Sequence, residues 1–378
     1  MKMKKDVNTK ANTIVEKQFF AAINQTTEII IPSATEELAR GRDREFISYG
    51  KDNRFPDYLW SLYEDVPTLA AIVNGTVDYA TGEGVICNVK GFDVQMNSKG
   101  ETIEEIMAKC MIDKMVFGGY YLSIIRDRAG KVAEVYHIDY RNVRTDKKNE
   151  VFFYSEDWSK KSTGRVDTIL YPKFLYNVDQ PASILFVKGK SNRDVYTKPI
   201  YYPSLVACEI ERKINKFHLN SISNGFSASY MINFNNGQPT DEIKEEIEKN
   251  INKKFAGSEN AGRIMLTFNS DKDHSTTVLP FDIKDFGEKY TKLASRSKEQ
   301  ISISFGCNLN LFGNTTENLG FNSEEYKSSF LLYNKTRILP LQNEFSMVMD
   351  KIFGQENTIT IEPFIIDFEG NKEDKEVL

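Results

Sequence analysis

The sequence predicts an α+β fold: an α+β body with two long helices, a small α/β insert between them, a long polar loop and a further long helix. Three observations support this prediction. Helix-like and strand-like patterns both occur before residue 203. Two long amphipathic segments enclose a β-α-β pattern. A stretch rich in Asn, Thr and Gly precedes the last long helical segment.

Composition limits the classes of protein to which the chain can belong. Its 378 residues, 40% of them hydrophobic, suffice for two or three domains with a sizeable core. No apolar run approaches the roughly 20 residues of a membrane span, and the basic N-terminus lacks the apolar centre of a signal peptide. We therefore expect a protein that is made and kept in a cytosol and that contacts no membrane. The net charge of −5 is not that of a tight duplex-DNA binder, but charge alone does not decide between a protein that binds no nucleic acid and one that lets DNA pass.

The cysteine pattern argues against a metal centre. Cys87, Cys110, Cys208 and Cys307 lie far apart, with no CxxC spacing. We expect reduced and mostly buried thiols, and no cofactor.

The first part of the body is predicted to be helical. Residues 1–45 form a polar, partly flexible arm, and residues 46–203 form the α+β body. After a helix over residues 56–63, Asp65 is expected to cap a second helix that has Pro67 in its first turn. A third helix is expected over Ile103–Phe117, with Thr102 as N-cap and Gly118 ending it.

Strands dominate the second part of the body. Residues 120–138 predict a hairpin whose turn spans Asp127–Lys131. Three further strand-like runs follow, near residues 150–158, 168–176 and 182–189.

The remaining chain alternates long helices with other elements. A helix over residues 204–222 precedes an insert at 223–283, in which a helix at 241–255 lies between strands at 228–234 and 262–268, and residues 276–280 form another strand. A second long helix spans residues 284–306 and should lie beside the first. The polar loop at 307–321 follows. Residues 322–378 then give a helix that Pro340 kinks or ends, a return strand and a short tail.

Candidate catalytic motifs are weak. Gly189-Lys190-Ser191 matches the end of a phosphate-binding loop, but Ile184 stands where that pattern needs glycine. His137 and Asp139 lack a nucleophile or a third ligand nearby in sequence. We expect no enzymatic activity. A nucleotide-acting enzyme with an inserted domain, and a structural capsid or adaptor protein without a DNA channel, remain as alternatives.

The order of these segments resembles that of the portal (head–tail connector) proteins of long-tailed bacteriophages. The resemblance extends from about Tyr49 to Phe353. It includes the segment "FGGYYLSIIRDRAGKVAEVYHIDYRNVR" and a polar loop, "FGCNLNLFGNTTENLGFNSEEY", followed by a long helix. The stretches that carry it are residues 49–85, 117–144, 224–268 and 305–342.

The resemblance implies a ring, usually a dodecamer, around a central channel for double-stranded DNA at one capsid vertex. Residues 46–203 would be the wing, 204–222 and 284–306 the stem helices, 223–283 the clip and 307–321 the tunnel loop. Little chain follows Phe353, so the crown would be short or absent, or the chain would be truncated. The implied partners are DNA during packaging and ejection, the terminase large subunit, a head-completion adaptor, and the major capsid and scaffold proteins. The protein would assemble in the host cytoplasm and reside in the virion.

The hypothesis assigns two sets of residues to the channel. Leu309, Leu311 and Phe312 would anchor the loop against a neighbouring subunit. Positive charges on the stem helices would steer phosphates, and acidic neighbours such as Glu209 and Glu211 would keep binding weak. The stem residues are Arg212, Lys213, Lys216, Lys289, Lys292 and Arg296, and the loop residues that face DNA are Asn308, Asn310, Asn314, Thr315 and Asn318.

Overall fold

The fold contains both helices and strands, as predicted, and the chain divides into two compact units. The larger unit comprises residues 29–213 and 292–378, and the smaller comprises residues 1–28 and 214–291. A computed structural model describes residues 20–22, 31–40, 45–158, 168–176, 178, 180–189, 195–223, 231–234, 240–255, 265–268, 283–313 and 323–366.

The third helix of the body confirms its sequence prediction. Helix α3 spans Ile103–Phe117, and the Thr102 hydroxyl accepts a hydrogen bond from the Glu105 N–H while the Glu105 carboxylate accepts one from the Thr102 N–H. Gly118 ends the helix at φ 87°, in the left-handed region. A side chain there would also stand 2.5 Å from the Lys198 carbonyl oxygen. Both ends of α3 are therefore fixed by local chemistry visible in the sequence.

The first two helices differ from the prediction in their capping. Helix α1 spans Phe55–Asp65 and α2 spans Pro67–Thr81, so Pro67 does lie in the first turn of α2. The N-cap of α2 is Val66, not Asp65, and no side chain of the helix's own N-terminus accepts its first N–H groups. The acceptor comes from elsewhere in the chain, as described below.

The described residues of the larger unit form three antiparallel sheets. The predicted hairpin is confirmed: β5 pairs with β6 across the turn closed by Asp127 and Lys131. The sheets follow the strand orders β2-β3-β7-β8-β9, β10-β5-β6 and β13-β4. Their strands are β2 Glu36–Arg40, β3 Glu45–Tyr49, β4 Gly84–Cys87, β5 Gly119–Arg126, β6 Val132–Ile138, β7 Val143–Thr145, β8 Val151–Tyr154, β9 Ile169–Pro172, β10 Ala182–Lys188 and β13 Ile359–Glu362.

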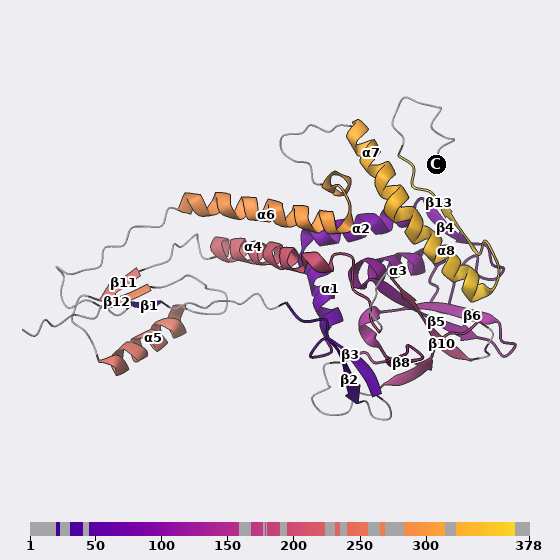
Figure 1. The fold of residues 1–378 in the computed structure, drawn as a ribbon, viewed down its shortest axis with the longest axis horizontal. Coiled ribbons are helices and arrows are strands. Elements are labelled where there is room, and N and C mark those ends of the chain that lie inside the picture. The colour runs from indigo at the N-terminus through magenta and orange to yellow at the C-terminus, as the bar shows by residue number, and fades with distance from the viewer. Residues whose placement is uncertain are drawn as a thin grey trace, which may run out of the picture. The chain divides into compact units, whose positions relative to one another are not determined.

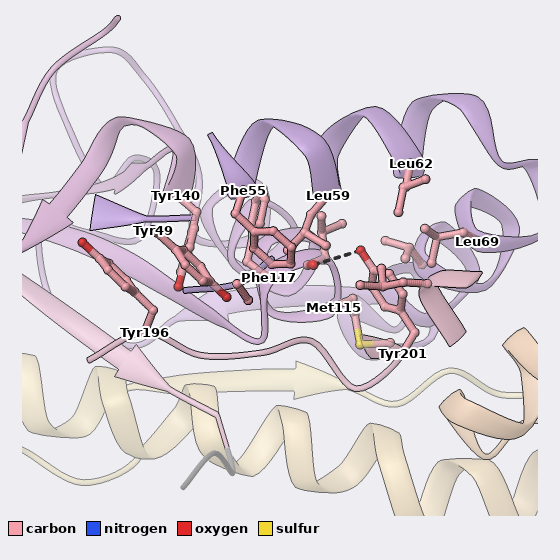
Figure 2. Packing of buried hydrophobic residues seen from close by; sticks show 14 of the residues in the cluster. Tyr49, Phe55, Leu59, Leu62, Leu69, Met115, Phe117, Tyr140, Tyr196 and Tyr201 are labelled. Atoms are coloured by element: carbon pink, nitrogen blue, oxygen red, sulfur yellow. Dashed lines mark hydrogen bonds between the residues drawn. The ribbon is translucent and has the colours of Figure 1, made fainter. Parts of the chain in front are cut away.

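Buried aromatic residues join these sheets to the helices. Tyr49 stacks on Tyr196 with ring centroids 4.6 Å apart, and Phe117 stacks on Tyr140 at the same separation (Figure 2). Most of the tyrosine hydroxyl groups in this cluster are hydrogen-bonded within the core. The Tyr201 hydroxyl, for example, donates to the Val116 carbonyl oxygen at 3.1 Å. Short 3₁₀ turns at Tyr140–Asn142 (η1) and Tyr202–Ser204 (η3) connect parts of this core.

The C-terminal helices form one rod along the larger unit (Figure 1). Helix α7 (Ser323–Tyr333) passes through a π-helical turn, η5 (Asn334–Ile338), into α8 (Leu339–Phe353). Pro340 therefore does not end the helix, contrary to one of the two predicted outcomes. In the π turn, the Leu339 N–H donates to the Asn334 carbonyl oxygen. The turn lies just before Pro340, which has no backbone N–H to donate.

The N-terminal region contains more regular structure than the predicted arm. Strand β2 lies in the five-stranded sheet of the larger unit, and β1 (Phe20–Ala22) pairs with a strand of the smaller unit. Both strands are short, and their partners lie elsewhere in the chain. Strand alternation within residues 1–45 alone did not reveal them.

The smaller unit confirms the predicted β-α-β insert. Strands β11 (Met231–Phe234) and β12 (Met265–Phe268) run parallel and are connected through α5 (Asp241–Phe255), while β1 adds to β12 in the antiparallel sense. The predicted strand at residues 276–280 lies outside the described residues. Among the described helices, none is long and apolar enough to cross a membrane.

Candidate nucleic-acid interface

Two long helices, α4 (Leu205–Ser223) and α6 (Ile283–Phe305), are antiparallel neighbours, as the sequence predicts. At the start of α4, the Ser204 hydroxyl donates to the Gln300 carbonyl oxygen at 2.9 Å. Further along α4, the Phe217 ring lies 4.8 Å from the Tyr290 ring near the start of α6. The two helices are therefore in contact at both of these positions.

The acidic residues of α4 do not lie on its exposed face. Glu209 and Glu211 are 2% and 4% exposed. The Glu209 carboxylate accepts a hydrogen bond from the Arg212 guanidinium at 2.8 Å. The expectation that these two carboxylates weaken phosphate binding at the helix surface is therefore wrong, because both side chains point into the larger unit.

Glu211 instead caps a different helix. Its carboxylate accepts hydrogen bonds from the Thr68 hydroxyl at 2.9 Å and from the Thr68 N–H at 3.3 Å, in the first turn of α2. A negative group at a helix N-terminus interacts favourably with the helix dipole. Burial raises the pKa of the Glu211 carboxyl above its ordinary value of 4.5, and the hydrogen bonds from Thr68 act in the opposite direction. This long-range cap supplies the acceptor that the N-cap residue Val66 lacks.

The predicted stem cations occupy two kinds of environment. Arg212 is half-buried, and its guanidinium contacts Asp65 at 3.4 Å in addition to Glu209. The other described cations are exposed on the two helices, and Lys289 lies in α6 with its side chain outside the description. The exposed residues are Lys213, Lys216, Lys292 and Arg296.

The connection between α6 and α7, residues 306–322 (the α6–α7 loop), is described as far as Gly313. Gly306 follows α6 at φ 66°, and a short 3₁₀ helix, η4 (Leu309–Phe312), comes next. The Asn308 side-chain oxygen accepts from the Asn310 N–H and so caps η4, while its amide donates to the Ser329 hydroxyl of α7 at 3.3 Å. Gly313 ends η4 in the left-handed region at φ 81°.

The apolar residues of η4 pack within their own subunit. Leu311 is buried, and its carbonyl oxygen accepts a hydrogen bond from the Tyr79 hydroxyl of α2 at 3.0 Å. Leu309 and Phe312 pack on the core of the larger unit. The expectation that these three residues anchor the loop to a neighbouring subunit is wrong, because they pack on their own subunit. Asn314, Thr315 and Asn318 lie outside the described residues.

The residues singled out for catalysis have structural partners. His137 pairs with Asp113 at 2.8 Å rather than with Asp139, which pairs with Arg141. Burial raises the pKa of the Asp113 carboxyl, whereas His137 lowers it. The Gly189 N–H donates to the Gly118 carbonyl oxygen.

The predicted state of the cysteines agrees with the structure. All four cysteines are free thiols, three of them buried. Within the described part of the chain, no group of three His, Cys, Asp or Glu side chains is placed to hold a metal ion.

Comparisons with known proteins agree with this geometry. The chain resembles the neck of a native gene transfer agent particle with C12 symmetry, at 16% identity and a TM-score of 0.52, over 88% of this chain and 87% of that one. It resembles the virion of a native gene transfer agent particle at 16% identity and a TM-score of 0.51, over 81% and 83% of the two chains. These likenesses show that the fold is shared.

A search of curated proteins gives no match. The family model described as phage portal protein matches residues 95–364, which is more than half of the chain and includes α4, the insert, α6, the α6–α7 loop and the C-terminal rod. The chain therefore belongs to the phage portal protein family.

Proposed function

We propose that this chain is the subunit of a ring at one capsid vertex through which double-stranded DNA enters and leaves the particle. The family match over residues 95–364 carries the proposal. The likeness to a neck structure with C12 symmetry supports a ring of twelve copies. In this role the protein is a structural component of the virion and not an enzyme.

We infer that α4 and α6 are the stem helices and line the channel. Lys213 and Lys216 on α4, and Lys292 and Arg296 on α6, expose positive charge to a passing polyanion. Each phosphate that a cation neutralises adds salt-dependent affinity, so a few such charges steer DNA without holding it tightly. Arg212 would contribute less than its neighbours, because its charge already faces Glu209 and Asp65.

The α6–α7 loop is the proposed tunnel loop. Asn310, Asn314, Thr315 and Asn318 are its candidate DNA-facing residues, since amide and hydroxyl groups hydrogen-bond a phosphate without ion pairing. Asn308 is reassigned to the base of the loop, because both ends of its side-chain amide are occupied by Asn310 and Ser329.

We further propose that the remaining parts serve assembly. The smaller unit, with β11, α5 and β12, would be the clip at which the terminase large subunit docks during packaging and a head-completion adaptor docks afterwards. The sheets of the larger unit would be the wing that meets the major capsid and scaffold proteins. The protein would assemble in the host cytoplasm.

Electron microscopy of the purified chain, with and without the scaffold protein, tests the ring. Closed rings with an open bore are expected. A chain that stays monomeric under both conditions and hydrolyses a nucleotide contradicts the proposal and favours the enzyme alternative. Rings or sheets with no bore favour a capsid or adaptor protein.

A shortened loop tests the channel. Deleting residues 314–319 should leave rings intact but reduce the yield of DNA-filled particles, because the narrowest contact with DNA is lost. The matched control carries an equal deletion at residues 371–376, in the predicted tail. Normal yields from the loop deletion would show that the loop has no role in DNA passage.

A further inference from the structure

The base of the α6–α7 loop rests on a glycine of α2. A Cβ atom built at Gly75 would stand 2.6 Å from Cδ1 and 2.8 Å from Cε1 of the Phe312 ring. Both distances are below any van der Waals contact between carbon atoms. Gly75 lies in the interior of α2, where glycine is a poor helix former. The glycine therefore stands where the Phe312 ring packs directly against the backbone of α2.

Other residues hold the same ring in place. The Phe312 centroid lies 6.1 Å from that of Tyr79 on α2 and 5.7 Å from that of Tyr333 on α7. The Tyr333 hydroxyl hydrogen-bonds the Thr76 hydroxyl at 2.7 Å, which joins α7 to α2 beside the ring. Thr76 gives its own proton to the Ile72 carbonyl oxygen, so Tyr333 is the donor. Phe312 therefore contacts aromatic side chains of both helices.

The backbone of η4 is fixed at the same place. The Tyr79 hydroxyl donates to the Leu311 carbonyl oxygen, and the Leu311 N–H donates to the Asn308 carbonyl oxygen at 3.1 Å. The chain then turns at Gly313, which has open space around its Cα. The placement of η4 and of Gly313 therefore depends on how deeply Phe312 sits against α2.

We propose that Gly75 is a positioning residue for the α6–α7 loop, acting through Phe312. The inference rests on the proposed function, because it takes that loop to be the contact with DNA. A side chain at position 75 lifts Phe312 from α2 and displaces η4, the described start of the loop. The contact of the loop with DNA is then impaired, although the subunit still assembles into rings.

Gly75→Ala is the direct test, because alanine favours the helix while clashing with the ring. Hydrogen exchange at the Leu311 amide should become about tenfold faster as η4 loosens. Asp78→Ala, at an exposed position one turn along α2, is the matched control and should leave that amide unchanged. In a Phe312→Val background, Gly75→Ala should have no further effect, since the ring carbons that it meets are gone.

The second measurement is the yield of DNA-filled particles assembled with each variant. Gly75→Ala should assemble rings as wild type does and lose filled particles, while Asp78→Ala behaves as wild type. Unchanged exchange at Leu311, or faster exchange with a normal yield, overturns the positioning role even if the loop deletion is harmful. A harmless loop deletion overturns the proposed loop function itself, and this inference with it.

Discussion

Removing the long-range cap of α2 should destabilise the larger unit measurably. Glu211→Ala deletes the carboxylate that accepts from the hydroxyl and the N–H of Thr68. Thr68 is buried, so water cannot fully replace that acceptor. The two donors would be left without a partner at the start of a helix whose own N-cap, Val66, offers no side-chain acceptor.

The expected magnitude follows from these contacts. A buried donor that loses its partner costs about 1–3 kcal/mol. Part of this cost is offset because the buried carboxylate is itself unfavourable, and its second oxygen, Oε2, accepts no hydrogen bond from the described residues. We expect Glu211→Ala to lower the free energy of unfolding by about 2 kcal/mol. Glu211→Gln keeps one acceptor oxygen and should cost less than about 1 kcal/mol.

The effect should also depend on pH. Because the pKa of Glu211 is raised in the folded state, its carboxyl contributes stability that is fully present below the ordinary value of 4.5. That contribution is lost as pH rises through the folded-state pKa. Wild type should therefore lose stability relative to Glu211→Gln as pH rises from 4.5 across that window.

Urea unfolding followed by tryptophan fluorescence measures this difference, since both tryptophans, Trp60 and Trp158, lie in the larger unit. Asn215→Ala, at an exposed position on the same helix, is the control. Two results would refute the reasoning: a Glu211→Ala protein within about 0.5 kcal/mol of wild type, or a Glu211→Gln protein as unstable as Glu211→Ala.

Two further predictions concern a buried arginine and two exposed cationic side chains of α6. Arg144 is fully buried and donates to the side-chain and backbone oxygens of Asn53 at 2.6 and 2.7 Å. Arg144→Met should therefore lower the free energy of unfolding by about 3 kcal/mol in the same urea assay. A decrease of less than about 1 kcal/mol would contradict this. Lys292→Gln combined with Arg296→Gln should weaken binding of the ring to duplex DNA and make the salt dependence of log K shallower by about 2 per subunit that contacts DNA, if each cation faces one phosphate. An unchanged salt slope would show that these two charges do not meet DNA.

Local chemistry explains which elements could be predicted from the sequence. The Thr-x-x-Glu pattern at Thr102 and the glycine at residue 118 predicted both ends of α3. The apolar faces of α4 and α6 likewise come from residues three or four positions apart in the sequence. The same holds for the β5–β6 hairpin, whose turn contains a glycine between Asp127 and Lys131. The parallel β11–α5–β12 unit followed from the order of its elements, because parallel strands need a crossover.

The features that were missed depend on partners far away in the chain. The Glu211–Thr68 cap joins positions separated by 143 residues, and nothing local to either residue marks it. Strand β1 is recognisable only through β12. The contact of Phe312 with α2 had one signal in the sequence, which is Gly75 inside an otherwise regular helix. Such a glycine often indicates close approach by another group, although the sequence does not say which.

The π turn between α7 and α8 has a consequence for how this rod tolerates change. The buried residues Phe330 and Tyr333 before the turn, and Phe345 and Met349 after it, all face the core. A π turn holds one residue more than an α turn, so it absorbs that residue locally and lets both halves keep these side chains on the core. Removing one residue from the π turn should therefore give a regular α-helix with the same buried face. A residue lost or gained elsewhere in the rod would instead rotate the following side chains by about 100°, so the π turn is the place where the length of this rod can change most easily.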